Sequence, residues 1–80
     1  MSKINVLLVE DEETLALIIK DTLETQGFSI RTARDGEEGL QMFFAQTPDV
    51  LVADVMMPRM DGFELVRRIR RRDSRTPVIF

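Results

Sequence analysis

The chain has 80 residues, of which 44% are hydrophobic and 31% charged, and its formal net charge at pH 7 is −3. These values are typical of one globular domain, and so small an acidic charge favours no general attraction to nucleic acid or to an anionic membrane. Cysteine and histidine are both absent, which excludes disulfides, thiolate or imidazole zinc sites and Ser-His-Asp hydrolysis within this chain.

Residues 15–19 form the longest apolar run, which is far shorter than the roughly 20 residues that cross a bilayer. No signal-peptide core follows Lys3. We therefore expect a cytoplasmic protein without a membrane partner, and the lack of cysteine fits a reducing compartment.

Residues 4–9 form a β-branched, nearly continuous apolar run, which is typical of a strand covered on both faces of a parallel sheet. Glu10 and Asp11 end this strand. Residues 12–26 repeat apolar side chains at helical spacing, and Gly27 follows where a helix end favours glycine. The predicted buried stripe of this helix comprises Leu15, Ile18, Ile19 and Leu23.

Residues 28–33 alternate well enough to predict a second strand. Asp35 and Glu38 resemble a capping box that opens a second helix. The Thr47-Pro48 pair ends that helix, because a residue before proline avoids helical backbone angles. Its predicted buried stripe comprises Leu40, Phe43 and Phe44.

Residues 49–53 predict a third apolar strand, with Asp54 at its carboxyl end and a loop over residues 55–60. Asp61 and Gly62 open a third, amphipathic helix whose arginines are expected to face solvent. Residues 77–80 begin a fourth strand. The inward side chains predicted for the third helix are Phe63, Val66 and Ile69, with Leu65 nearby.

Four apolar runs alternate with three helical patterns, so the connectivity is βαβαβαβ. Right-handed crossovers would assemble them into a parallel sheet with helices on both faces, a three-layer α/β fold. In the flavodoxin-like strand order, ligands bind beyond the carboxyl ends of strands 1 and 3. We therefore expect Glu10, Asp11 and Asp54 to share one pocket.

Three clustered carboxylates would repel one another by about 4 kcal/mol per pair at 4 Å and an effective dielectric of 20. A divalent cation would offset this repulsion, and all-oxygen ligation with few protein ligands suits Mg²⁺. The backbone carbonyl of Met56 is a candidate further ligand. Asp54 is the best placed nucleophile, because a buried strand fixes it and aspartate can accept phosphoryl groups.

Two segments resemble the receiver domain of two-component response regulators. They are residues 9–12, Val-Glu-Asp-Glu, after the first strand, and residues 54–62, Asp-Val-Met-Met-Pro-Arg-Met-Asp-Gly, after the third. The similarity covers the whole chain in order and spacing, including the Asp35-Gly36 turn and the Thr76-Pro77 pair before the fourth strand.

This resemblance implies a flavodoxin-like (CheY-like) sheet of order 2-1-3-4 and a phosphoprotein of phosphorelay signal transduction. Asp54 would be the phosphoacceptor, Mg²⁺ would be held by Glu10, Asp11, Asp54 and the Met56 carbonyl, and the partner would be a histidine kinase or a phosphotransfer protein. The chain would then be a substrate, with at most slow phosphorylation and dephosphorylation of itself, and not an enzyme.

The family's fold is about half as long again, so on this resemblance residues 1–80 are the N-terminal two thirds of a single receiver domain. The family's switch serine or threonine and its lysine, which contact the phosphoryl oxygens, would fall after Phe80. The alternative hypothesis is therefore a phosphorylation-incompetent fragment that acts only in protein interactions. Its uncovered fourth strand would favour a homodimer or a strand-exchanged oligomer.

Simpler interpretations exist for several of these residues. Asp54 alone could be a turn residue, and Glu12 and Glu13 fit a helix N-terminus through its dipole. The arginines from 67 to 75 fit a solvated face better than a nucleic-acid surface. The three methionines of the 55–60 loop fit packing better than metal ligation.

A magnesium-dependent phosphatase acting on an external substrate is a third, weaker hypothesis. It needs a general acid close to the nucleophile for turnover, and the position two residues after Asp54 is occupied by Met56.

Overall fold

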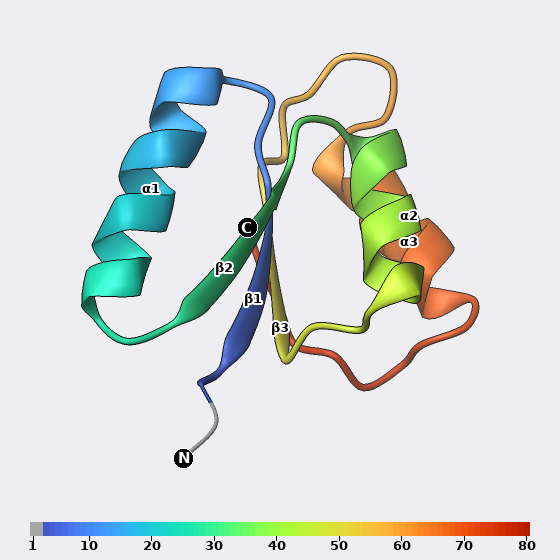
Figure 1. Cartoon of the computed structure of the whole chain (residues 1–80). Helices are drawn as coiled ribbons and strands as arrows, with labels where there is room; N and C mark the ends of the chain where they lie inside the picture. Colours follow the sequence, from blue (N-terminus) through green and yellow to red (C-terminus); the bar gives the residue numbers. More distant parts are fainter. Residues whose placement is uncertain (1–2) are drawn as a thin grey trace.

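A four-stranded parallel sheet forms the centre of the molecule (Figure 1). The computed structural model describes residues 3–80. The strand order is β2-β1-β3-β4 and all pairings are parallel, which confirms the predicted order 2-1-3-4. Along the chain the elements are β1 (Asn5–Val9), α1 (Glu13–Thr25), β2 (Ser29–Ala33), α2 (Gly36–Ala45), β3 (Val50–Ala53), α3 (Gly62–Arg70) and β4 (Val78–Ile79).

Helices cover both faces of the sheet, with α1 on one face and α2 and α3 on the other (Figure 1). Successive strand residues point to opposite faces, so β1 supplies Val6 and Leu8 to the smaller core beside α1 and Leu7 and Val9 to the larger core beside α2 and α3. All four side chains are at most 2% exposed. The central strand is thus covered on both faces, as its continuous apolar run predicts.

The residues that helix α1 turns toward the sheet differ from those predicted. Ile19 and Leu23 pack against the smaller core together with Ala16, whereas Leu15 and Ile18 are 43% and 57% exposed. The residues at 16, 19 and 23 follow helical spacing and form one face, and within residues 3–80 no second helix lies beside α1 on its side of the sheet. The helix ends as predicted, with Gly27 at φ +96°, a conformation that glycine adopts without steric cost.

Helix α2 begins with a modified capping box. The Asp35 side chain accepts the Glu38 N–H at 2.8 Å, as in the usual motif. The Glu38 carboxylate accepts the N–H of Arg34 at 2.9 Å, one residue before the position that the motif predicts. Of the predicted stripe, Phe43 is fully buried and Leu40 and Phe44 pack at the edge of the core.

Helix α3 faces the sheet through Leu65 and Ile69, both fully buried, with Val66 partly buried. The prediction that Phe63 faces inward is wrong, because that side chain is 60% exposed and its ring lies 4.9 Å from the ring of Phe80. Two residues along a helix correspond to roughly 200° of rotation, so burying Leu65 turns Phe63 outward.

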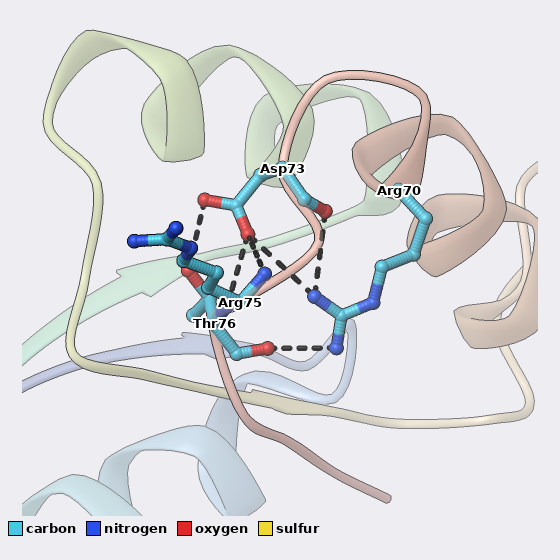
Figure 2. Close-up of polar contacts among 4 residues, drawn as sticks. All are labelled: Arg70, Asp73, Arg75 and Thr76. Atoms are coloured by element: carbon cyan, nitrogen blue, oxygen red, sulfur yellow. Dashed lines mark hydrogen bonds and ion pairs between the residues drawn. The ribbon is translucent and has the colours of Figure 1, made fainter.

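The connection between α3 and β4 is fixed by a polar network around Asp73 (Figure 2). The Asp73 carboxylate accepts the N–H groups of Arg75 and Thr76 at 3.0 and 2.9 Å and the Thr76 hydroxyl at 3.0 Å. The Arg70 guanidinium donates to the Thr76 carbonyl at 2.7 Å and lies 3.6 Å from the Asp73 carboxylate. These bonds set the path of the chain into β4.

The arginines of α3 lie mainly at the surface, as predicted. Arg67 and Arg68 both bind the carboxylate of Glu64. Arg72, which follows the end of α3, lies over the ring of Phe44 at 4.4 Å from its centroid. Across residues 3–80, every helix is too short or too polar to traverse a lipid bilayer.

Candidate functional site

The carboxyl ends of β1 and β3 lie side by side because Val9 and Ala53 are register partners. The N–H of Asp54 donates to the carbonyl of Val9 at 3.0 Å, and the N–H of Glu10 donates to the carbonyl of Ala33 on β2 at 3.0 Å. Parallel pairing therefore continues one residue beyond the strands and fixes the backbones of Glu10 and Asp54 next to each other.

Three carboxylates converge at this edge of the sheet. One oxygen each from Glu10, Asp11 and Asp54 lies within 4.8 Å of the others. Glu10 is buried, Asp54 is half-buried and Asp11 is exposed, so the cluster is open to solvent on one side. The predicted convergence of these three residues is confirmed.

Burial raises the pKa of Glu10 above the ordinary glutamate value, and the negative charge of nearby Asp54 raises it further. The opposing contribution comes from the N–H of Glu12, which donates to the Glu10 carboxylate at 3.0 Å and favours the ionised form. Ionised Glu10 is thus held at an energetic cost, and a cation among the three carboxylates would lower that cost.

The loop after β3 contributes a backbone donor to the cluster. The N–H of Met56 donates to a carboxylate oxygen of Asp54 at 3.1 Å, which orients that side chain. Met57 and Met60 pack in the core as predicted, but the Met56 side chain is 80% exposed, so the packing interpretation is wrong for that residue. The role of the Met56 carbonyl as a metal ligand stays a prediction.

Glu12 caps α1, in agreement with the interpretation of the acidic block as a helix start. Its carboxylate accepts the N–H groups of Thr14 and Leu15 at 3.2 and 2.7 Å. The side chain is therefore engaged with the helix, and the cluster of three carboxylates that could hold a cation does not include it.

A groove of about 750 Å³ adjoins the acidic cluster, between α1 and the end of β2. Its walls carry acidic groups at Glu10, Asp11 and Glu13 and basic groups at Lys20 and Arg34. Sequence reasoning missed Lys20 and Arg34, because they come from two elements and no spacing along the chain relates them. Of the three clustered acids, Glu10 and Asp11 line this groove and Asp54 does not.

The donor set fits a hard divalent cation. It offers oxygen atoms only, from few protein groups, which leaves coordination positions for water or for a phosphoryl oxygen, as Mg²⁺ prefers. A carboxylate held by the sheet and oriented by a backbone N–H can also act as a nucleophile toward phosphorus.

Comparisons with known proteins identify the family of this chain. The response regulator receiver domain family matches residues 6–80. The transcriptional regulatory protein TrcR of Mycobacterium tuberculosis is 44% identical over 99% of this chain, although the match covers only 31% of TrcR. The chain thus spans about a third of the length of such curated relatives.

Solved structures show the same fold. The Vibrio cholerae chemotaxis protein CheY4 superposes with a TM-score of 0.92 at 34% identity, covering 96% of this chain and 66% of CheY4. The response regulator TrrA of Thermotoga maritima, solved with Mg²⁺-BeF, gives a TM-score of 0.85 at 35% identity, covering 90% of this chain and 62% of TrrA. TrrA in complex with the histidine kinase ThkA gives a TM-score of 0.88 at 32% identity, covering 96% of this chain and 66% of TrrA. The chain therefore belongs to the response regulator receiver domains of two-component systems.

Proposed function

We propose that Asp54 accepts a phosphoryl group from a phosphohistidine of a histidine kinase or phosphotransfer protein. The observation that carries this proposal is the position of Asp54, whose backbone is bound to β1 and whose carboxylate lies within 4.8 Å of those of Glu10 and Asp11. The TrrA structures support it, because that relative is seen both with Mg²⁺-BeF and with a histidine kinase.

In the transfer, a carboxylate oxygen of Asp54 attacks the phosphorus atom and the bond from phosphorus to the histidine nitrogen breaks. The products are an acyl phosphate on Asp54 and a free imidazole. The Met56 N–H donates to one oxygen of the Asp54 carboxylate and so orients the group that would attack. The chain is then the acceptor in a transfer whose donor is another protein, and not an enzyme.

Mg²⁺ is the proposed cofactor, held by Glu10, Asp11, Asp54 and the Met56 carbonyl. It would neutralise the charge that builds up on the phosphoryl oxygens as they approach three carboxylates. The raised pKa of Glu10 supports this assignment, because it reflects the burial of the Glu10 carboxyl group and, to a smaller extent, the negative charge of Asp54 beside it.

A cytoplasmic location is also proposed, on the absence of cysteine.

Self-association stays a prediction. It would use the outer edge of β4, where Ile79 and Phe80 are 56% and 53% exposed, because an unpaired edge strand can pair with another chain. Sedimentation at several concentrations checks it, and a monomer at every concentration would contradict it.

Intact mass spectrometry tests the phosphoacceptor role. The chain is incubated with acetyl phosphate and Mg²⁺, beside Asp54→Asn and beside a sample without Mg²⁺. We expect one phosphoryl group to be gained only by the unmodified chain with Mg²⁺. If the chain with Mg²⁺ gains none, the phosphorylation-incompetent alternative replaces the proposal.

A further inference from the structure

Gly62, the first residue of α3, touches the backbone of Asp54 directly. The N–H of Gly62 donates to the carbonyl of Val55 at 3.0 Å. A Cβ atom built on Gly62 would overlap the Asp54 carbonyl oxygen and would lie 3.1 Å from both the Asp54 carbonyl carbon and the Cα of Val55. Only a residue without a side chain lets α3 begin this close to Asp54.

We propose that Gly62 is a positioning residue for Asp54, whose missing side chain lets α3 buttress the peptide that follows the phosphoacceptor. Asp54 is then held from two sides, because its N–H is bound to the Val9 carbonyl on β1 and its carbonyl side rests against Gly62. This inference rests on the proposed function of Asp54 as phosphoacceptor.

The neighbours of Gly62 are backbone atoms, and this distinguishes it from a glycine that only permits helix packing. A Cβ on Gly39 would lie 2.8 and 3.2 Å from the two methyl carbons of Val9 and 3.6 Å from a methyl carbon of Leu65. The three nearest atoms are side-chain methyl carbons, which can shift without displacing a peptide group. The Asp54 carbonyl can yield only if the Asp54–Val55 peptide shifts, and the carboxylate and the Met56 N–H that binds it move with that peptide.

The far end of the same loop is held by a second glycine. A Cβ on Gly36 would lie 2.9 Å from the carbonyl oxygen of Met60 and 3.0 Å from its Cβ. The loop of residues 55–61 is therefore contacted by a glycine near each end. Gly62 lies against the Asp54 and Val55 backbone, and Gly36 lies against Met60.

The test compares Gly62→Ala with Gly39→Ala, a control that adds one methyl group at the fourth residue of α2, against side chains and not against backbone. Phosphorylation by acetyl phosphate with saturating Mg²⁺ is followed by intact mass at a temperature where circular dichroism shows each variant folded. We expect the rate at saturating donor to fall at least tenfold for Gly62→Ala, because small misplacements of a reacting group cost on the order of 10²-fold. The donor concentration giving half the maximal rate should stay within about twofold for both variants, and the rate for Gly39→Ala should also stay within about twofold. Equal rates for the two variants would overturn the inference.

Amide chemical shifts give a readout that does not depend on phosphorylation. In Gly62→Ala the amides of Asp54, Val55 and Met56 should shift, whereas in Gly39→Ala they should keep their positions. Unchanged amide shifts at these residues in Gly62→Ala would overturn the inference, whether or not the chain accepts phosphate. Failure of the unmodified chain to accept phosphate would refute the phosphoacceptor role of Asp54 and would leave the amide test of Gly62 in force. If Gly62→Ala does not fold, Gly36→Ala is measured in both assays, and an unchanged rate with unchanged Met56 and Met60 amides then counts against positioning.

Discussion

Val9 and Ala53 are register partners at the ends of β1 and β3, so the residues that follow them, Glu10 and Asp54, emerge together. The parallel register therefore concentrates negative charge around Glu10, which is only 7% exposed to solvent. The fold keeps this unfavourable arrangement at the carboxyl ends of two adjacent parallel strands.

We expect Glu10→Gln to stabilise the metal-free chain and to weaken its response to Mg²⁺. The folded-state pKa of Glu10 is raised, so ionised Glu10 opposes folding at pH values above that pKa, and an uncharged amide removes the penalty. The melting midpoint at pH 7 without Mg²⁺ should rise by a few degrees, since each 1 kcal/mol moves it by roughly 4–8 °C in a domain of this size.

Thermal unfolding with and without Mg²⁺ checks this prediction. The unmodified chain should gain about 2.7 kcal/mol when Mg²⁺ is 100-fold above its dissociation constant, and Glu10→Gln should gain much less. Glu37→Gln, an exposed acid in the first turn of α2, serves as the control and should respond like the unmodified chain. A lower midpoint for Glu10→Gln without Mg²⁺ would show that the cluster is not under electrostatic strain.

Leu65→Ala and Phe63→Ala should differ sharply in stability. Leu65 is fully buried, so its truncation should cost about 2–5 kcal/mol. Phe63 is 60% exposed and its ring centroid lies 4.9 Å from that of Phe80, so its truncation should cost at most about 1 kcal/mol. Urea unfolding of both variants measures the difference, and equal costs would mean that α3 is rotated from the orientation seen here.

Asp73→Asn should destabilise the chain at neutral pH and have a smaller effect in acid. Hydrogen bonds hold the pKa of Asp73 below its ordinary value of 3.8, first that from the Thr76 N–H, then those from the Arg75 N–H and the Thr76 hydroxyl. The positive charge of Arg70 lowers this pKa further. A carboxyl group whose folded-state pKa is lowered stabilises the fold above the unfolded-state pKa, and this contribution is lost as pH falls through the folded-state pKa.

Urea unfolding from pH 7 down to the acid limit of the native state measures this dependence. The difference between the unmodified chain and Asp73→Asn should be constant above about pH 5 and should narrow below pH 3.8. Asp49→Asn offers a comparison with another loop aspartate that accepts a single backbone N–H, that of Asn5 at 2.8 Å. A gap for Asp73→Asn that does not change with pH would exclude an ionic contribution.

Arg59→Gly should be more stable than Arg59→Ala. Arg59 has φ 67°, the left-handed conformation, and is the one non-glycine residue with positive φ among residues 3–80. Left-handed backbone costs a residue with a Cβ about 1–2 kcal/mol, and glycine avoids that cost. Both variants remove the exposed ion pair with Asp35, which is 3.9 Å long, so the comparison isolates the backbone term. Equal unfolding midpoints would contradict the prediction.

Most of the fold could be predicted from local patterns. Each strand is a short apolar run and each helix has a start signal, so the seven elements appear in the predicted order. The acidic cluster was also predictable, because parallel strands place their carboxyl ends together and Glu10, Asp11 and Asp54 stand at two such ends.

What could not be predicted depends on contacts between distant residues. The apolar spacing of α3 fits Phe63 or Leu65 inward equally well, and only packing against the sheet selects Leu65. The approach of Gly62 to the Asp54 carbonyl needs the three-dimensional path of the loop. The bonds of Asp73 to the chain three residues ahead could have been suspected from turn chemistry, but the reach of Arg70 into them could not.

Helix α1 contributes no fully buried side chain, whereas α2 contributes Phe43 and α3 contributes Leu65 and Ile69. Elements with few buried contacts open at lower free energy than the rest of a domain. The amide protons of α1 should therefore exchange with solvent deuterium earlier than those of β1 and β3. Because the N–H of Glu12 binds the Glu10 carboxylate just before this helix, each opening of α1 frees a carboxylate of the acidic cluster, and cation binding there should in turn slow the exchange of the first turn of α1.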